Sequence, residues 1–224
     1  MDIKTQYDHI GEEYVSGQKD FFSKRDDEAF QFIKGSLPDI HGKAVLDIGC
    51  GHGQDIKLLE SLGANVYGID TSAFMIDKAK KVVSCPENLV VGNIEHTEFA
   101  DQTFDVAVGR FSLHYLWNFE YAYPEIARIL KHHGILVLVV HHPFRDLTYK
   151  KNKVYSKQEI VRIKLYDNKV PILFPTHTLK DYFSKKFFES FYLTGYEEEH
   201  SPEEGVDEFQ TPAFMGFSAI RKGL

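Results

Sequence analysis

Short apolar runs alternate with helix-like patterns along the chain from Val45 onward. The runs are β-branched or aliphatic and nearly continuous, as strands buried on both faces require. They predict strands at 44–48, 66–69, 89–91, 104–108 and 135–140. Between them, apolar residues recur at intervals of three and four, which predicts helices at 54–62, 72–83 and 121–131. This alternation indicates an α/β fold with a doubly wound, Rossmann-like, mostly parallel sheet and helices on both faces.

The alternation breaks after Pro143. The basic and aromatic stretch that follows, to about Pro175, is too long for a simple connection, so we expect an insertion with its own structure. Beyond it, the pattern predicts a helix at 177–186 and two closing strands at 190–196 and 213–221. We expect a single domain over residues 1–224, with an N-terminal helical part (1–40), a core (41–142), the insertion (143–176) and a C-terminal part of the sheet (177–224).

Composition narrows the classes of partner. The chain has 224 residues, 43% of them hydrophobic, and can bury a core of its own. Its net charge of −7 disfavours nucleic acid and anionic membranes, because the average field repels phosphate. The densest basic stretch is interleaved with acidic and apolar residues and is interpreted mainly as a solvated face (Lys150, Lys151, Lys153, Lys157, Arg162, Lys164).

The two cysteines, Cys50 and Cys85, show no spacing typical of a zinc site or a disulfide framework, so we expect a reducing compartment and no metal. No stretch approaches the roughly 18 apolar residues that a membrane span needs. These features lead us to expect a cytoplasmic protein.

The most informative segment runs from Val45 to Asp55 and reads VLDIGCGHGQD. It is a predicted strand that enters a glycine-rich turn and then a helix. Glycines at alternate positions let the main chain turn tightly and leave no side chain where a ligand lies against the backbone. Asp47 stands at the end of this strand. Asp70 ends the next strand, where a carboxylate can accept hydrogen bonds from both hydroxyls of a ribose.

A dinucleotide-binding fold is the competing interpretation, because it also binds ribose through an acid at this place. Its fingerprint needs a third glycine where Gln54 stands. A carboxylate at Asp47 would also repel a pyrophosphate, whereas it would attract the amino group of a methionine moiety. The segment therefore favours a methyl donor over a nicotinamide or flavin nucleotide. A glycine-rich turn without a ligand is the remaining alternative.

The segment resembles the first motif of class I S-adenosylmethionine-dependent methyltransferases, close to the metabolite-methylating group that includes the ubiquinone-biosynthesis methyltransferases. Further segments are similar to the second, fourth and fifth strand regions of that family: VYGIDTS (66–72), FDVAV (104–108) with FSLH (111–114), and ILKHHGIL (129–136). The similarity covers roughly residues 40–142. It implies a seven-stranded sheet with the last strand antiparallel, S-adenosylmethionine as cofactor, and a small-molecule metabolite as methyl acceptor.

The resemblance also implies which residues bind the cofactor: Asp47, Gly49, Cys50, Gly51, Gly53, Asp70, Thr71, Met75, Asn93, Ile94, Arg110 and Phe111. Asn93 stands where the family usually carries an acid that binds the adenine amino group, and its amide oxygen can accept the same hydrogen bond. His132 and His133 replace the proline and glycine common before the fifth strand, which changes the expected turn there.

Catalysis demands little from side chains, because a sulfonium is already an activated leaving group. The protein must place the acceptor in line and exclude water. A hydroxyl or ammonium acceptor also benefits from a general base. The candidates are His114 after the fourth strand, His141 or its neighbour His142 after the fifth, and Tyr7. Packing alone is the alternative for His114.

Tyr7 and Tyr14 share one face of a predicted helix that, in similar sequences, folds over the cofactor as a lid; an ordinary apolar stripe predicts the same pattern. The insertion is expected to decide substrate choice. Arg145, Tyr149 and Tyr155 are candidate contacts of the methyl acceptor; the alternative is that they are surface residues without a ligand role. Trp117 and Phe119 either line the acceptor pocket with apolar surface or only pack against neighbouring side chains. Four further aromatic residues are predicted to belong to the core (Phe21, Phe22, Phe30, Phe32).

The expected function is transfer of a methyl group to oxygen or nitrogen of a small molecule by in-line SN2 displacement, by a monomer or homodimer. An enzyme of the same fold that methylates RNA or protein is one alternative. The acidic balance and the lack of an Asn-Pro-Pro-Tyr type motif count against it. A non-catalytic cofactor-binding protein is the other, and the intact glycine loop counts against that.

Overall fold

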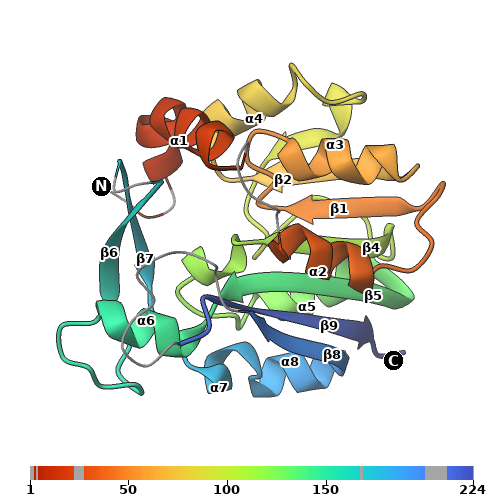
Figure 1. Cartoon of the computed structure of the whole chain (residues 1–224). Helices are drawn as coiled ribbons and strands as arrows, with labels where there is room; N and C mark the ends of the chain where they lie inside the picture. Colours follow the sequence, from red (N-terminus) through yellow and green to blue (C-terminus); the bar gives the residue numbers. More distant parts are fainter. Residues whose placement is uncertain (1–2, 4, 23–27, 167–168, 200–210, 224) are drawn as a thin grey trace.

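The computed structural model describes residues 3, 5–22, 28–166, 169–199 and 211–223. A seven-stranded sheet runs through the molecule in the order β3-β2-β1-β4-β5-β9-β8 (Figure 1). The first five strands are parallel, and β9 pairs antiparallel with both β5 and β8. The strands are β1 (Ala44–Ile48), β2 (Asn65–Asp70), β3 (Leu89–Val91), β4 (Phe104–Arg110), β5 (Leu130–His141), β8 (Phe191–Glu199) and β9 (Phe214–Arg221). This confirms the expected fold class, including the antiparallel last strand.

Helices cover both faces of the sheet, and the alternation of side chains along β5 shows why. Leu136 and Leu138 pack into a core with α5, α7 and α8, whereas Val137 and Val139 pack into a second core with α2, α3 and α4. A strand that is apolar on both faces must be covered on both. The helices are α1 (Gln6–Phe22), α2 (Glu28–Ser36), α3 (Gln54–Ser61), α4 (Ala73–Ala79), α5 (Ala122–Ile129), α6 (Pro143–Tyr149), α7 (Leu179–Tyr182) and α8 (Lys185–Ser190), with short 3₁₀ turns η1 (Pro86–Asn88) and η2 (Leu113–Tyr115).

Local signals set several of the boundaries. Ser72 caps α4, because its hydroxyl accepts a hydrogen bond from the amide of Met75 at 3.2 Å. Gly63 follows α3 with φ +84°, as expected for a helix stop. Of the aromatic residues predicted to be core, Phe30 is buried and Phe32 packs against the second core; the side chains of Phe21 and Phe22 lie outside the described part.

Several predicted boundaries are wrong. The helix expected at 72–83 is α4, which ends four residues early, at Ala79. The helix expected at 177–186 is two short helices, because Thr178 forms a capping box that begins α7 and Ser184 caps a new helix, α8. The helix expected at 121–131 ends at Ile129, and β5 begins at Leu130, five residues before the predicted strand. An irregularity in the pairing of β4 and β5 near Phe104 accommodates this early start.

The insertion has its own structure, as expected. It consists of α6 and an antiparallel hairpin of β6 (Ile160–Leu165) and β7 (Val170–Pro175), which pairs separately from the main sheet. Val161, Ile172 and Phe174 of this hairpin form a small apolar cluster with Ile10 of α1. The N-terminal helix and the insertion therefore pack together beside the main sheet (Figure 1).

The basic stretch of the insertion is solvated except at Lys150. This side chain is only 3% exposed, and its ammonium donates to the backbone carbonyls of Val154 and Lys157. Its interpretation as part of a solvated face is therefore wrong: it holds the loop between α6 and β6. Within the described residues, no helix is long and apolar enough to cross a membrane.

Candidate active site

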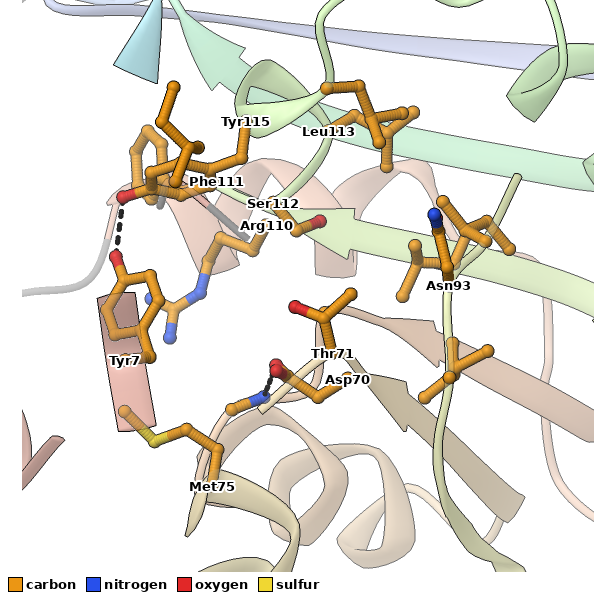
Figure 2. A pocket seen from close by; sticks show the side chains of 18 of the residues that line it. Tyr7, Asp70, Thr71, Met75, Asn93, Arg110, Phe111, Ser112, Leu113 and Tyr115 are labelled. Atoms are coloured by element: carbon orange, nitrogen blue, oxygen red, sulfur yellow. Dashed lines mark hydrogen bonds between the residues drawn. The ribbon is translucent and has the colours of Figure 1, made fainter. Parts of the chain in front are cut away.

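A cavity lies beside the carboxyl ends of β1, β2 and β4 (Figure 2). Its empty volume is about 880 Å³, which includes open solvent at its mouth. Ten of the residues predicted as functional line it: Tyr7, Gly49, Gly51, Asp70, Thr71, Met75, Asn93, Ile94, Arg110 and Phe111. Parallel strands present their carboxyl ends at one edge of the sheet, which is why residues distant in sequence meet here.

The glycine turn after β1 forms part of this wall. Gly49, Gly51 and Gly53 have φ values of +70°, +51° and +86°, a region that other residues avoid. A Cβ atom on Gly49 would lie 2.3 Å from the Cβ atom of Ser112, another residue of the wall. Glycine at position 49 is therefore required both by its backbone conformation and by the close approach of the turn after β4.

Asp70 is fixed in the cavity by main-chain donors. Its Oδ2 accepts a hydrogen bond from the amide of Gly51 at 2.9 Å (Figure 2). Its Oδ1 accepts one from the amide of Ser72 at 2.8 Å. Burial raises the pKa of Asp70 above its ordinary value, and these two amides oppose that rise. The carboxylate is thus held in one orientation, with lone pairs left for the hydroxyls of a ligand.

Charged groups gather on the other side of the glycine turn. Arg110 lies on the wall, and its Nε is 2.7 Å from Oδ2 of Asp55 in a largely buried ion pair. Asp47 is 2% exposed, and its Oδ2 has no hydrogen-bond partner among the described residues. Burial, and then the neighbouring Asp55, raise the pKa of Asp47 well above its usual range. A carboxylate left unpartnered beside a cation suits a ligand that carries both an ammonium and a carboxylate group.

The N-terminal helix closes one side of the cavity. The hydroxyls of Tyr7 and Tyr115 are 2.5 Å apart, and the ring of Tyr14 meets that of Tyr7 edge to face at 4.9 Å. The shared helix face expected for Tyr7 and Tyr14 is confirmed. Sequence reasoning missed Tyr115, although it directly follows the candidate His114. It also missed Tyr166 of the insertion, whose ring packs on Tyr14 at 5.5 Å.

Polar contacts fix α1 to the start of α4 and to the hairpin of the insertion. Oδ1 of Asp8 accepts hydrogen bonds from the hydroxyl of Ser72 at 2.5 Å and the amide of Phe74 at 3.2 Å. The side-chain amide of Gln6 exchanges two hydrogen bonds of 2.9 Å with the main chain of Leu173 in β7. The helix thereby connects the start of α4 to the hairpin of the insertion.

Asn93 lies on the wall together with Ile94. Its side chain pairs with Glu95: Oδ1 accepts from the Glu95 amide at 3.0 Å, and Nδ2 donates to the Glu95 carboxylate at 2.9 Å. A carbonyl oxygen has two lone pairs, so Oδ1 retains the capacity to accept a further hydrogen bond from a ligand.

None of the three candidate histidines is among the residues that line the cavity. His114 is fully buried, and its ring stacks on that of His141 at 4.2 Å with planes 13° apart. Burial lowers the pKa of His114 well below its ordinary value, and neither of its ring nitrogens has a hydrogen-bond partner among the described residues. His142 points elsewhere, with Nε2 3.0 Å from the carboxylate of Glu198.

The remaining predicted residues are also absent from the cavity wall. Asp47, Cys50 and Gly53 belong to the glycine segment but do not line the cavity. Trp117 is 54% exposed and Phe119 is buried against Tyr182, so the packing alternative holds for Phe119 and neither residue lines the pocket.

The acceptor contacts suggested within the insertion serve its own structure. The guanidinium Nε of Arg145 donates to the hydroxyl of Tyr149 at 3.0 Å, and the Tyr155 hydroxyl accepts from the amide of Leu179 at 2.7 Å. None of these three residues is part of the cavity wall.

Comparison with known proteins agrees with this geometry. Residues 46–138 match the family model described as a methyltransferase domain. An uncharacterised protein of Methanocaldococcus jannaschii is 33% identical over 140 residues, which are 62% of this chain and 52% of that protein. A malonyl-[acyl-carrier protein] O-methyltransferase of Hamiltonella defensa is 27% identical over 67% of this chain and 59% of its own length. The chain thus spans about half the length of the first curated relatives it matches.

Solved structures share the fold at low sequence identity. An S-adenosylmethionine-dependent methyltransferase from Mesorhizobium loti superposes with a TM-score of 0.65 at 19% identity, covering 84% of this chain and 95% of that one. The geranyl diphosphate C-methyltransferase from Streptomyces coelicolor, solved with S-adenosylhomocysteine, has a TM-score of 0.62 at 14% identity, covering 87% of this chain and 77% of its own. Residues 46–138 thus match a methyltransferase domain, and the sheet order and glycine turn confirm the class I methyltransferase fold that the sequence predicts.

Proposed function

We propose that this protein transfers a methyl group from S-adenosylmethionine to oxygen or nitrogen of a small-molecule metabolite. The observation that carries the proposal is the Asp70 carboxylate, held in the cavity by the amides of Gly51 and Ser72 beside the glycine turn. This arrangement suits the two hydroxyls of a ribose. When bound, S-adenosylmethionine supplies a methyl group already activated on a sulfonium.

In this proposal, residues of the cavity wall bind the cofactor together with Asp47 of β1, which lies next to the wall residues Ile48 and Gly49. Asp70 holds the ribose, and Asn93 and the main chain of Ile94 hold the adenine ring. Asp47, whose Oδ2 lacks a partner in the described part of the chain, attracts the ammonium of the amino-acid end, and Arg110 attracts its carboxylate. Their task is placement, which in a displacement reaction lowers the barrier by fixing the line of attack.

The cover formed by α1 and the insertion supports a small acceptor rather than RNA or protein. Tyr7, Tyr14 and Tyr115 close the cavity with large apolar surfaces, which excludes water from the site of transfer. Burial raises the pKa of Tyr7 well above its ordinary value, so its hydroxyl stays protonated and does not act as a base. His114, with both ring nitrogens buried, supports the wall behind Tyr115.

Calorimetric titration of the protein with S-adenosylmethionine and S-adenosylhomocysteine tests the cofactor assignment, with NADH and NADPH as controls. We expect micromolar binding of the first two and none of the nicotinamides. Absence of binding by the first pair, or tight binding of a nicotinamide, would remove the basis of the proposal. Release of S-adenosylhomocysteine in the presence of candidate acceptors then measures turnover and separates the enzyme from a non-catalytic binding protein.

Tyr7→Phe is expected to weaken S-adenosylmethionine binding by about 1 kcal/mol, or roughly fivefold, because it removes the hydroxyl that pairs with Tyr115 across the cavity. Amide hydrogen exchange in α1 should become faster in the same variant. Tyr149→Phe serves as the matched control, since the Tyr149 hydroxyl contacts Arg145 away from the cavity. Equal effects of the two variants on cofactor affinity would argue against a lid role for Tyr7.

A further inference from the structure

The carboxyl group of Asp146 is a buried titratable group that the proposed cofactor site does not use. Its side chain in α6 has no exposure, and neither of its oxygens has a hydrogen-bond partner among the described residues. A buried carboxylate without partners is unfavourable, and such groups often indicate a catalytic role when they persist. Its nearest cation-forming group is His141, whose Nδ1 lies 3.5 Å from Oδ1 of Asp146.

The other titratable groups that face Asp146 do not serve as its direct partner. Two of these groups are His177, which precedes α7, and Tyr182, which lies within α7. Asp146 is close enough to contribute to the pKa of each, in the direction of raising it. Nε2 of His177 is already 3.1 Å from the backbone carbonyl of His114. The hydroxyl of Tyr182 is buried without a hydrogen bond to any described group. His141 is therefore the ring that presents a nitrogen to Asp146 at ion-pair distance.

The orientation of His141 leaves its second ring nitrogen, Nε2, accessible to a ligand. Nδ1 is buried toward Asp146, yet the side chain keeps 16% exposure, so its accessible edge is the one away from the carboxylate. The ring packs edge to face on Phe111 of the cavity wall at 5.7 Å and on Phe174 of the insertion at 4.8 Å. It thus lies between the cofactor cavity and the insertion.

We propose that Asp146 and His141 form a general-base dyad for methyl transfer, with Asp146 as the positioning residue. The acceptor is then a molecule that carries a proton on its nucleophilic atom, namely a hydroxyl or ammonium compound. This inference rests on the proposed methyltransferase function and goes beyond it by naming the class of acceptor and the partner of the base. The distance of 3.5 Å is long for a hydrogen bond, but such contacts tighten when substrates bind.

The proton and electrons are accounted for within this step. Nε2 of His141 takes the proton of the acceptor, and the freed lone pair of the acceptor forms a bond to the methyl carbon. The bond between that carbon and sulfur breaks, and its electron pair stays on sulfur. The resulting imidazolium is stabilised by the Asp146 carboxylate, as in other carboxylate–histidine pairs, and it returns its proton to solvent through its exposed edge.

A test that needs no acceptor is nitrogen NMR of protein labelled with ¹⁵N-histidine, at a pH where the His141 ring is neutral. The dyad requires the proton on Nδ1 in the wild-type protein, because the carboxylate can only accept. Asp146→Asn should shift the proton population toward Nε2. Glu198→Gln, which alters the carboxylate beside His142, should leave the His141 signals unchanged. A wild-type Nε2–H tautomer, or signals unaffected by Asp146→Asn, would overturn the dyad.

Turnover provides the second readout. A panel of alcohols, phenols, amines and carboxylic acids is screened with S-adenosylmethionine, and the product is identified by mass spectrometry. Asp146→Asn and His141→Gln are expected to reduce kcat by on the order of 10²–10⁴-fold at unchanged cofactor affinity. Turnover within twofold of wild type, or methylation of carboxylic acids alone, would contradict the dyad while leaving the methyltransferase assignment intact. Absence of cofactor binding would instead contradict the methyltransferase assignment itself.

Discussion

Replacing Asp70 with alanine is expected to weaken S-adenosylmethionine binding by on the order of 2–4 kcal/mol, or about 30- to 900-fold. The carboxylate is held by the amides of Gly51 and Ser72 at 2.9 and 2.8 Å, so it offers its remaining lone pairs without reorganising. Charge-assisted hydrogen bonds in a site shielded from water are stronger than neutral ones. The variant loses these bonds and also leaves two main-chain amides without their acceptor.

Two further variants separate ligand binding from folding. Asp77→Ala removes the same charge from an exposed position on α4 and should leave cofactor affinity nearly unchanged. Asp70→Asn keeps one acceptor oxygen and should give an intermediate loss. Affinity is measured by calorimetry at a temperature where thermal unfolding shows each variant to be folded. Wild-type affinity in folded Asp70→Ala would exclude Asp70 as the ribose ligand.

The sequence predicts most of the sheet because its signals are local. The apolar runs at β1 and β3 give their exact boundaries, because a short run of apolar residues between turn residues is recognisable from local sequence alone. The glycine turn and Asp70 are likewise local, because backbone conformation and a strand end determine them. These features place ten of the predicted functional residues on the cavity wall.

The groups behind the wall were less accessible to sequence reasoning because they meet only in the fold. Asp146 approaches His141 through the turn into α6, and nothing in the spacing distinguishes it from a surface acid on a helix. Asp55 belongs to the glycine segment, but its ion pair with Arg110 joins residues from α3 and the end of β4. The sequence predicts one helix in place of α7 and α8 because the apolar period continues across Ser184, whose hydroxyl caps a new helix.

Gly49→Ala is expected to destabilise the protein by about 2–5 kcal/mol and to weaken cofactor binding at the same time. Two costs combine at this position. The φ of +70° costs a residue with a Cβ atom about 1–2 kcal/mol. The added Cβ would also lie 2.3 Å from that of Ser112, and overpacking costs typically 1–3 kcal/mol. Because Gly49 and Ser112 both line the cavity, the shift that relieves the contact must deform the cofactor site.

Two variants separate these costs in urea unfolding. Gly42→Ala has the same φ of +70° but open space around the new Cβ, so it should lose only the backbone part, about 1–2 kcal/mol. Adding Ser112→Gly to Gly49→Ala removes the clashing Cβ and should bring the loss down to the level of Gly42→Ala. The non-additivity of the pair then measures the contact itself. Equal losses for the two alanine variants, or no recovery in the double variant, would mean that the approach of Ser112 does not constrain the glycine turn.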